Sequence, residues 1–245
     1  MRSRRIQAKP EHKEEACSQI DLAVAAKALE KEVGWTGGPL HLFEKVGRDA
    51  FDTALASGLL PHHKLLDFGA GMLRLGYWFV RFLDTGNYYA IEPRATALDA
   101  GKRHLFGPDI LRDKTPKFYV SNECDMTTFG VPFDFVVARS ILTHAKPGML
   151  HRILDEFSKC AAPGGIMLAS YWAHGGENAC TLDGHIGDQL GRKEWGFVGV
   201  IKYSLGYLEA AALEHGLTVE EFVLSPPLNQ QIWLRFRLLP GIRVT

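Results

Sequence analysis

The sequence lacks several features that would direct it to a special class of protein. Its cysteines show no C-x-x-C spacing, which argues against a zinc site, an iron–sulfur cluster and a disulfide scaffold. They are Cys17, Cys124, Cys160 and Cys180. Net charge is also absent, because 28 basic residues balance 28 acidic ones, so no overall attraction to nucleic acid or an anionic membrane is expected. No run of about 18 uncharged apolar residues occurs, and no apolar segment follows the basic N-terminus. We therefore expect a cytoplasmic protein with reduced thiols, no nucleic-acid partner and no membrane partner.

What is present is a regular alternation of strand and helix patterns. The 245 residues, 46% of them hydrophobic, are enough to bury the core of one α/β domain. Apolar runs bounded by Gly, Pro or Asn predict five strands, at "KLLDFG", "YYAIEP", "KFYV", "FDFVVARS" and "GGIMLASYW". Helical spacing between them is clearest over residues 147–162. This alternation predicts a parallel, doubly wound α/β sheet.

Both ends of the chain depart from this alternation. Near the C-terminus, "LTVEEFVL" and "QQIWLRFRL" flank "SPPLN" and predict a hairpin that adds an antiparallel strand. Ahead of the sheet, residues 12–33 and 40–58 read as two helices joined by "GWTGGPL", with too few apolar residues for a core of their own. We expect residues 1–58 to form a helical lid over the ligand cleft and residues 59–245 to form the main domain.

The segment "LLDFGAGMLRLG", residues 65–76, runs from a strand through a glycine-rich turn into a helix. A phosphate-binding Walker loop needs Lys followed by Ser or Thr, and neither is present. A dinucleotide turn needs a small residue at its third glycine position, where Arg74 stands. The segment fits D-x-G-x-G, with Asp67 before Gly69 and Gly71. A carboxylate at this place can accept hydrogen bonds from an ammonium group, which S-adenosylmethionine has and NAD lacks there.

Acidic residues after the next two strands extend this interpretation. Glu92 ends the second strand run, where a carboxylate can accept both ribose hydroxyls, although NAD enzymes share that feature. Asp125 follows the third strand, where its carboxylate can accept the exocyclic amine of adenine, and Met126 can cover the adenine face. Together the three carboxylates fit a ligand that consists of a nucleoside with an amino-acid tail.

On these segments the sequence resembles the class I S-adenosylmethionine-dependent methyltransferases. "LLDFGAG" looks like their first motif, "YYAIEP" like their second-strand acid, "FDFVVARSILTHA" like their fourth strand and following loop, and "CAAPGGIMLASYW" like the turn into strand five. The resemblance covers roughly residues 60–238 and implies a seven-stranded, mostly parallel sheet. It implies S-adenosylmethionine over the carboxyl ends of strands one, two and four, with S-adenosylhomocysteine as product. No metal is expected, because His174 and His185 with Glu177 and Asp183 form no recognised ligand pattern. The expected cofactor contacts are Asp67, Gly69, Ala70, Gly71, Arg74, Glu92, Pro93, Asp125, Met126 and Arg139.

Two departures from the family pattern have consequences. Leu73 stands where the third glycine of G-x-G-x-G is usual, which restricts the backbone at the turn. Arg74 has two interpretations, either a partner for the methionyl carboxylate or a solvated residue of the first helical turn. The tetrapeptide common for amide nitrogens is replaced by "ARSI", which makes methylation of nucleobases and amides less expected.

The expected reaction is in-line methyl transfer to an oxygen or nitrogen of a small-molecule acceptor. His144, after the fourth strand, is the candidate general base, and a histidine that only shapes the loop is the alternative. Tyr203 is the next catalytic candidate. It also joins a set that predicts an apolar or aromatic acceptor pocket, Trp172, Trp195, Phe197 and Tyr203.

Three further hypotheses remain open from the sequence. The chain could bind S-adenosylmethionine without methylating, as a scaffold or a cyclase-like enzyme, because fold and site do not fix the reaction. It could also be an NAD-linked oxidoreductase. Beyond the small-molecule acceptor, the remaining partner considered is a second copy of the chain in a homodimer.

Overall fold

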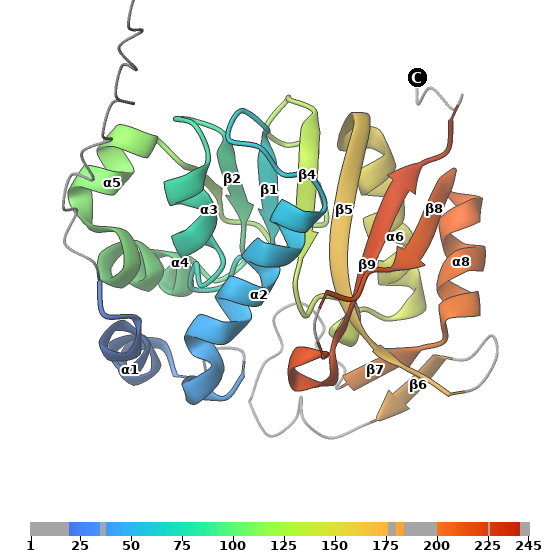
Figure 1. Ribbon diagram of the computed structural model, residues 1–245, viewed down its shortest axis with the longest axis horizontal. Helices are drawn as coiled ribbons and strands as arrows, with labels where there is room; N and C mark the ends of the chain where they lie inside the picture. Colours follow the sequence, from blue (N-terminus) through green and yellow to red (C-terminus); the bar gives the residue numbers. More distant parts are fainter. Residues whose placement is uncertain (1–19, 35–37, 176–179, 184–199, 225, 241–245) are drawn as a thin grey trace, which may run out of the picture.

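The computed structural model describes residues 20–34, 38–175, 180–183, 200–224 and 226–240. A twisted sheet crosses the molecule, with α2 in front of it and α6 behind it (Figure 1). Five parallel strands are arranged in the order β3-β2-β1-β4-β5. They are β1 (Leu65–Phe68), β2 (Tyr88–Ile91), β3 (Lys117–Tyr119), β4 (Phe133–Ala138) and β5 (Ala161–Ala173). The parallel, doubly wound sheet predicted from the sequence is confirmed.

The C-terminal hairpin completes this sheet. Strand β9 (Ile232–Leu238) lies antiparallel to β5, and β8 (Leu217–Glu221) lies antiparallel to β9. The main sheet therefore reads β3-β2-β1-β4-β5-β9-β8, the seven-stranded arrangement that the resemblance implied. The predicted antiparallel hairpin is also confirmed.

A second hairpin, which the sequence did not predict, extends from the carboxyl end of β5. Strand β7 (Val200–Tyr203) pairs in parallel with Trp172 and Ala173, and β6 (Cys180–Asp183) pairs antiparallel with β7. Long β5 thus has β9 beside its middle and β7 beside its last two residues. In Figure 1 β6 and β7 lie at the lower edge of the molecule, as does α1.

Helices cover both faces, and their ends follow local chemistry. They are α3 (Gly76–Phe82), α4 (Ala95–Gly101), the π-helix η2 (Lys102–Phe106), α5 (Gly107–Lys114), the 3₁₀ turn η3 (Leu142–His144), α6 (Pro147–Cys160), α8 (Leu205–Glu214) and the 3₁₀ turn η5 (Leu228–Gln230). Helix α6 begins at a proline, which is favoured at a first helical position. It was predicted to reach residue 162, but it ends at Cys160 because Ala161 already begins β5.

The two N-terminal helices are shorter than predicted. Helix α1 (Leu22–Val33) begins after Asp21, whose carboxylate accepts hydrogen bonds from the backbone of Ala23 and Val24 and so fixes the start. The predicted start at residue 12 falls outside the described residues. Helix α2 (Phe43–Ala56) follows a 3₁₀ turn, η1 (Leu40–Leu42), that begins after Pro39 and replaces the predicted first helical turn.

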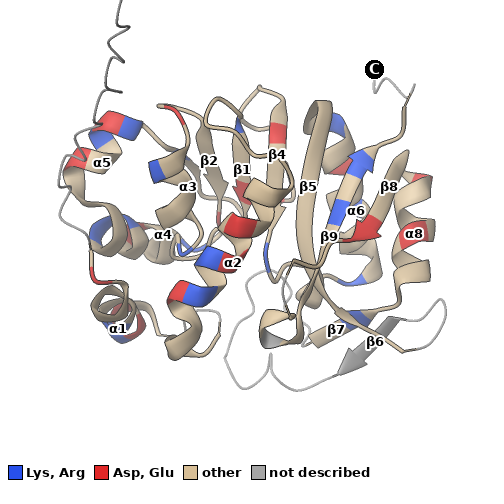
Figure 2. Ribbon diagram, in the orientation of Figure 1, with Lys and Arg blue, Asp and Glu red and all other residues tan. Residues whose placement is uncertain are grey.

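Apolar side chains of the N-terminal helices join the core on one face of the sheet. Leu29 and Ala50 are fully buried in the same cluster as Leu65 of β1, whereas Leu66 belongs to the cluster on the other face. All of β1 is buried because both faces of a parallel sheet are covered by helices. The outer side of α2 carries mixed charge, including an Arg48–Asp52 ion pair (Figure 2).

Candidate active site

The turn after β1 is tied to the end of β2. The backbone N–H groups of Gly69 and Ala70 donate to the carbonyl oxygen of Ile91 at 2.9 and 3.1 Å. Gly69 has φ of 77°, a conformation that favours glycine, and a Cβ there would also displace the end of the Ile141 side chain, whose Cδ1 would lie 2.2 Å away. Gly71 has φ of 56°, and an added Cβ would meet nothing within 4 Å. The turn therefore presents its backbone to open space beyond Gly71.

Leu73 adopts the left-handed conformation although it is not a glycine. Its φ is 63°, its N–H donates to the carbonyl of Ala70 at 2.9 Å, and its side chain is fully buried. The turn therefore keeps the shape of a glycine turn at the position where the sequence departs from the family pattern.

Glu92 is held in place by the same turn. The carboxylate is buried, and its Oε2 accepts from the N–H of Gly71 at 2.9 Å. Its Oε1 accepts from the N–H of Arg94 at 3.1 Å, and the Arg94 Nε lies 3.5 Å away. Half-buried Pro93 lies between them in the chain. A carboxylate has about four acceptor positions, so two remain after these backbone bonds.

Asp67 is buried at the end of β1 and bonded to a residue that the sequence analysis missed. Its Oδ2 accepts from the hydroxyl of Tyr88 at 2.7 Å. Burial raises the pKa of Asp67 to about 7; the Tyr88 hydrogen bond opposes this rise and the charge of Glu92 adds to it. Only the strand register could have indicated this hydrogen bond. Asp67 pairs with Ala90, and Tyr88 stands two residues before Ala90, so its side chain lies on the same face of the sheet.

Asp125 and Met126 follow β3 in an irregular segment. The Oδ1 of Asp125 accepts from both the N–H and the hydroxyl of Thr127, at 2.9 and 2.7 Å, which fixes a tight turn. Met126 is fully buried in the core, and its N–H donates to Glu156. The contacts to adenine expected for both residues stay predictions.

Arg74 is buried rather than solvated, so that alternative from the sequence is wrong. Only 6% of the residue is exposed, and its guanidinium lies 4.9 Å from the ring centre of Phe43 on α2. Burial lowers the pKa of Arg74 to about 10, and the charge of Arg139 contributes to the lowering. The two cations are therefore close enough to repel.

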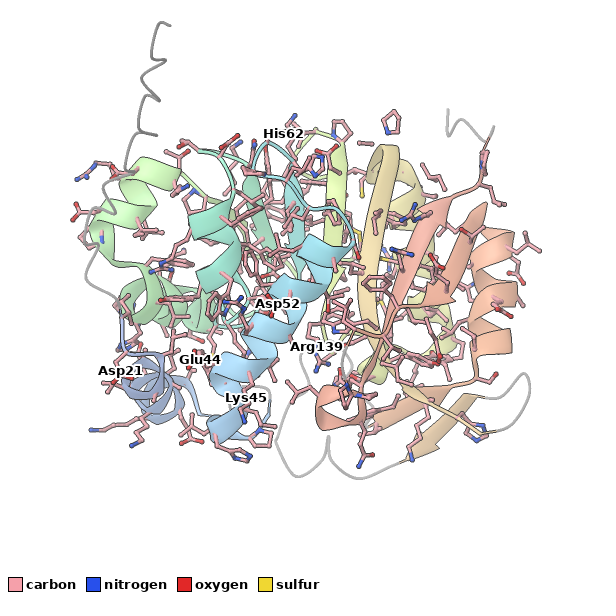
Figure 3. The ribbon with its side chains drawn as sticks, in the orientation of Figure 1. Asp21, Glu44, Lys45, Asp52, His62 and Arg139 are labelled. Atoms are coloured by element: carbon pink, nitrogen blue, oxygen red, sulfur yellow. The ribbon has the colours of Figure 1, made fainter. Side chains whose placement is uncertain are left out.

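Arg139 follows β4, and its side chain is turned toward β5 and β9. Its Nη1 donates to Oγ of Ser170 at 3.0 Å and to Oε1 of Gln231, and the guanidinium lies over the ring of Trp233 at 5.3 Å. Next to it, Ser140 has φ of 61° and donates its N–H to Ser170. Figure 3 shows Arg139 beside α2, with His62 at the opposite end of the sheet.

The two catalytic candidates, His144 and Tyr203, lie in or contact the loop after β4. His144 ends η3 with its ring 6.4 Å from that of Trp172, at an interplanar angle of 81°. Tyr203 is fully buried, stacks on Tyr207, and donates its hydroxyl to the carbonyl of Ala145. Trp195 and Phe197, expected in the acceptor pocket, lie outside the described residues.

Within the described residues, no group of three or more His, Cys, Asp and Glu side chains could hold a metal ion. No helix in the same part of the chain has the length and apolarity needed to cross a membrane.

The sheet order, the glycine turn and the acids at the strand ends define the class I methyltransferase fold. Solved structures share it at low sequence identity. The glycopeptide N-methyltransferase MtfA with S-adenosyl-L-methionine gives a TM-score of 0.60 at 15% identity, covering 79% of this chain and 94% of that one. The DhpI complex with SAH gives 0.59 at 16%, covering 89% and 98%. Magnesium protoporphyrin IX methyltransferase from Synechocystis PCC 6803 gives 0.54 at 12%, covering 79% and 82%.

Sequence comparison adds a family match over part of the chain. Residues 66–167 match the family described as "Methyltransferase domain", a range that runs from β1 to the middle of β5 and includes most of the candidate site. No curated protein sequence matches the chain. Residues 66–167 thus match a methyltransferase family, and the chain has the class I methyltransferase fold.

Proposed function

We propose that this protein transfers the methyl group of S-adenosylmethionine to an oxygen or nitrogen of a small-molecule acceptor by direct in-line displacement. The observation that carries the proposal is Glu92, a buried carboxylate fixed by the N–H groups of Gly71 and Arg94 beside an open glycine turn. Two acceptor positions of this carboxylate remain for the vicinal hydroxyls of a ribose.

The other candidate residues would contact the remaining parts of the cofactor. Asp67 would accept the methionyl ammonium group, and Arg74 would pair with the methionyl carboxylate. Asp125 and Met126 would contact adenine. The set that shapes the cradle by its backbone is Gly69, Ala70, Gly71 and Pro93.

S-adenosylmethionine supplies a sulfonium methyl that is already activated, so the chain mainly needs to orient the two reactants. Well-aligned reactants gain about 7–11 kcal/mol from such positioning. His144 would remove a proton from the acceptor, a contribution on the order of 10²- to 10⁴-fold. For Tyr203 we propose a positioning role, because its hydroxyl donates to the carbonyl of Ala145, next to His144.

The similar proteins are compatible with both acceptor atoms. One is named as a glycopeptide N-methyltransferase and another as an O-methyltransferase family protein from Burkholderia thailandensis. A cytoplasmic location and a homodimer stay predictions from the sequence.

The cofactor assignment is tested by calorimetric titration of Glu92→Ala with S-adenosylmethionine. Loss of a charged hydrogen-bond partner should weaken binding about ten- to a hundredfold. Glu123→Ala, which removes an exposed carboxylate near the end of β3, is the control and should bind as the parent does. A folded Glu92→Ala protein with parental affinity would show the assignment to be wrong.

Two alternatives are separated by simple measurements. Titration with NAD distinguishes an oxidoreductase, because the proposal predicts binding of S-adenosylmethionine alone. Incubation with candidate acceptors and detection of S-adenosylhomocysteine distinguishes a methyltransferase from a non-methylating scaffold or cyclase-like enzyme.

A further inference from the structure

Arg139 is a buried cation whose hydrogen-bond partners within the described residues are all neutral. Only 8% of the residue is exposed. Its Nη1 donates to side-chain oxygens of Ser140, Ser170 and Gln231, and its Nη2 donates to the carbonyl of Leu228 at 3.3 Å. Its Nε is buried without a hydrogen-bond partner. Buried arginines are normally matched by an anion, so this one is incompletely compensated.

The charges around Arg139 do not remove this imbalance. Burial lowers the pKa of Arg139 to about 10, and Asp49 on α2 opposes the lowering. The carboxylate of Asp49, however, accepts from Nε1 of Trp233 at 2.8 Å. Buried Arg74 adds a second positive charge nearby. The carboxylate that attracts Arg139 is thus already anchored to a neutral donor.

The geometry of the guanidinium determines which group would satisfy its remaining hydrogen-bond donors. Arginine binds a carboxylate or phosphate best through two parallel N–H groups on one edge. Nη1 of Arg139 is fully engaged by neutral oxygens, whereas Nε is unpartnered and Nη2 makes one long hydrogen bond. The edge with unused hydrogen-bond donors is therefore the buried one formed by Nε and Nη2.

A small cleft, lined by both apolar and polar residues, begins beside this cation. Its lining residues are Asp49, Thr53, Phe222, Val223, Leu224, Pro227, Leu228, Gln231, Ile232 and Trp233. Leu228, Gln231 and Trp233 also contact Arg139. Val223 and Leu224 are 58% and 52% exposed, so apolar surface is left uncovered at the cleft. An apolar wall next to an uncompensated cation fits a ligand with an apolar body and one anionic end.

We propose that the methyl acceptor is a carboxylic acid with an apolar body, and that the Nε and Nη2 edge of Arg139 binds its carboxylate. The carboxylate is a recognition group, and the methylated atom lies elsewhere on the acceptor. This inference rests on the proposed methyl transfer, and it replaces the cofactor contact that the sequence suggested for Arg139.

Benzoate is the probe, with benzamide as its neutral counterpart of the same shape. Calorimetric titration is performed on the protein saturated with S-adenosylhomocysteine. Benzoate should bind, and benzamide should bind at least tenfold more weakly, because only the anion forms charge-assisted hydrogen bonds. Equal affinities for the two compounds, or no benzoate binding, would overturn the proposal.

Matched variants of Arg139 and Arg74 distinguish an acceptor-binding role from a cofactor-binding role. Arg139→Gln should weaken benzoate about ten- to a hundredfold and leave the affinity for S-adenosylhomocysteine within twofold. Arg74→Gln should weaken S-adenosylhomocysteine and leave the affinity for benzoate nearly unchanged. If Arg139→Gln instead weakens S-adenosylhomocysteine as strongly as Arg74→Gln does, Arg139 is a cofactor residue and the proposal is wrong.

Folding of the variants is checked by thermal unfolding. If Arg139→Gln does not fold, Arg139→Lys takes its place, since it keeps the buried charge but removes the two-nitrogen edge, and it should still weaken benzoate at least fivefold. Parental benzoate affinity in a folded Arg139→Lys protein counts against the proposal. Failure of the wild-type protein to bind S-adenosylhomocysteine would overturn the proposed function instead, and titration of benzoate into the free protein would then still test Arg139.

Discussion

Leu73 shows how packing and backbone strain compete at a single residue. A non-glycine residue in the left-handed region costs about 1 kcal/mol or more, whereas truncating a buried leucine typically costs about 2–5 kcal/mol. Leu73 combines φ of 63° with complete burial. Packing is the larger effect, which explains why leucine can occupy a glycine position.

This balance predicts an unusual order of stability at Leu73. In most positions glycine is less stable than alanine, but here glycine relieves the strain that alanine retains. Both Leu73→Gly and Leu73→Ala should unfold at lower urea concentration than the parent, with Leu73→Gly more stable than Leu73→Ala by about 1 kcal/mol. The opposite order in chemical denaturation would contradict the strain argument.

The raised pKa of Asp67 predicts how cofactor affinity depends on pH. Below its pKa of about 7 the carboxyl is protonated and loses its attraction for an ammonium group. Affinity for S-adenosylmethionine should therefore fall as pH decreases from 7.5 toward 5.5, approaching about tenfold per pH unit well below the pKa. Calorimetry across this range checks the slope, and Asp67→Asn should remove it.

Tyr88 provides the control for this pH effect. Its hydroxyl donates to Asp67 and lowers the pKa of that carboxyl. Tyr88→Phe should therefore move the same affinity profile to higher pH without flattening it. A profile that does not move would show that Tyr88 only fills space.

His144 is tested by the pH dependence of the chemical step. A general base must be neutral to act, so single-turnover transfer should rise with increasing pH. His144→Ala should lower turnover about a hundredfold or more while S-adenosylmethionine affinity stays nearly unchanged. Parental single-turnover rates from pH 5.5 to 8 would remove His144 from the chemistry. His104→Ala, which loses only a surface contact with Glu32, is the control.

At the scale of elements, α1 and α2 form the part of the chain that we propose as a lid. Phe43 of α2 faces the guanidinium of Arg74, and Asp49 accepts from Trp233 of β9. Helix α2 thus contacts both the cofactor candidate and the sheet strand beside Arg139. A ligand that engages either arginine should stabilise this helix.

Hydrogen exchange measures that stabilisation. Amides of α1 and α2 should exchange more slowly when cofactor and acceptor are bound, because the helices close over the ligands. Helix α6, which packs on the other core cluster, should change little. Unchanged exchange in α1 and α2 of a complex shown to be saturated would exclude the lid.

Elements with a strong local pattern could be predicted, and elements without one could not. The strands of the main sheet were visible because each is a continuous apolar or alternating run. Strands β6 and β7 were missed because "CTLD" and "VIKY" mix apolar and polar residues without a clear run, and β7 joins β5 through only two residue pairs. Helix ends were misplaced where a local cap such as Asp21 decides them.

At the scale of the whole molecule, the same distinction holds for the site. The acids at the ends of β1 and β2 could be found because a parallel sheet brings carboxyl ends together. The contact of Arg139 with Gln231 could not, because it joins residues 92 positions apart through the register of β5 and β9. The bond from Tyr88 to Asp67 likewise depends on tertiary register.

Because β9 is synthesised late, the surroundings of Arg139 are completed only near the end of translation. Strand β9 is the last described strand to leave the ribosome, yet it pairs with β5 inside the sheet. Until residues 228–233 emerge, Arg139 lacks Gln231, Trp233 and the carbonyl of Leu228, and β5 has an open edge along Ile166–Tyr171. An open apolar edge strand invites pairing with other chains. A chain terminated early would therefore lose the proposed acceptor site and also tend to aggregate. We expect truncated copies to be removed by quality control rather than to accumulate as soluble, inactive protein.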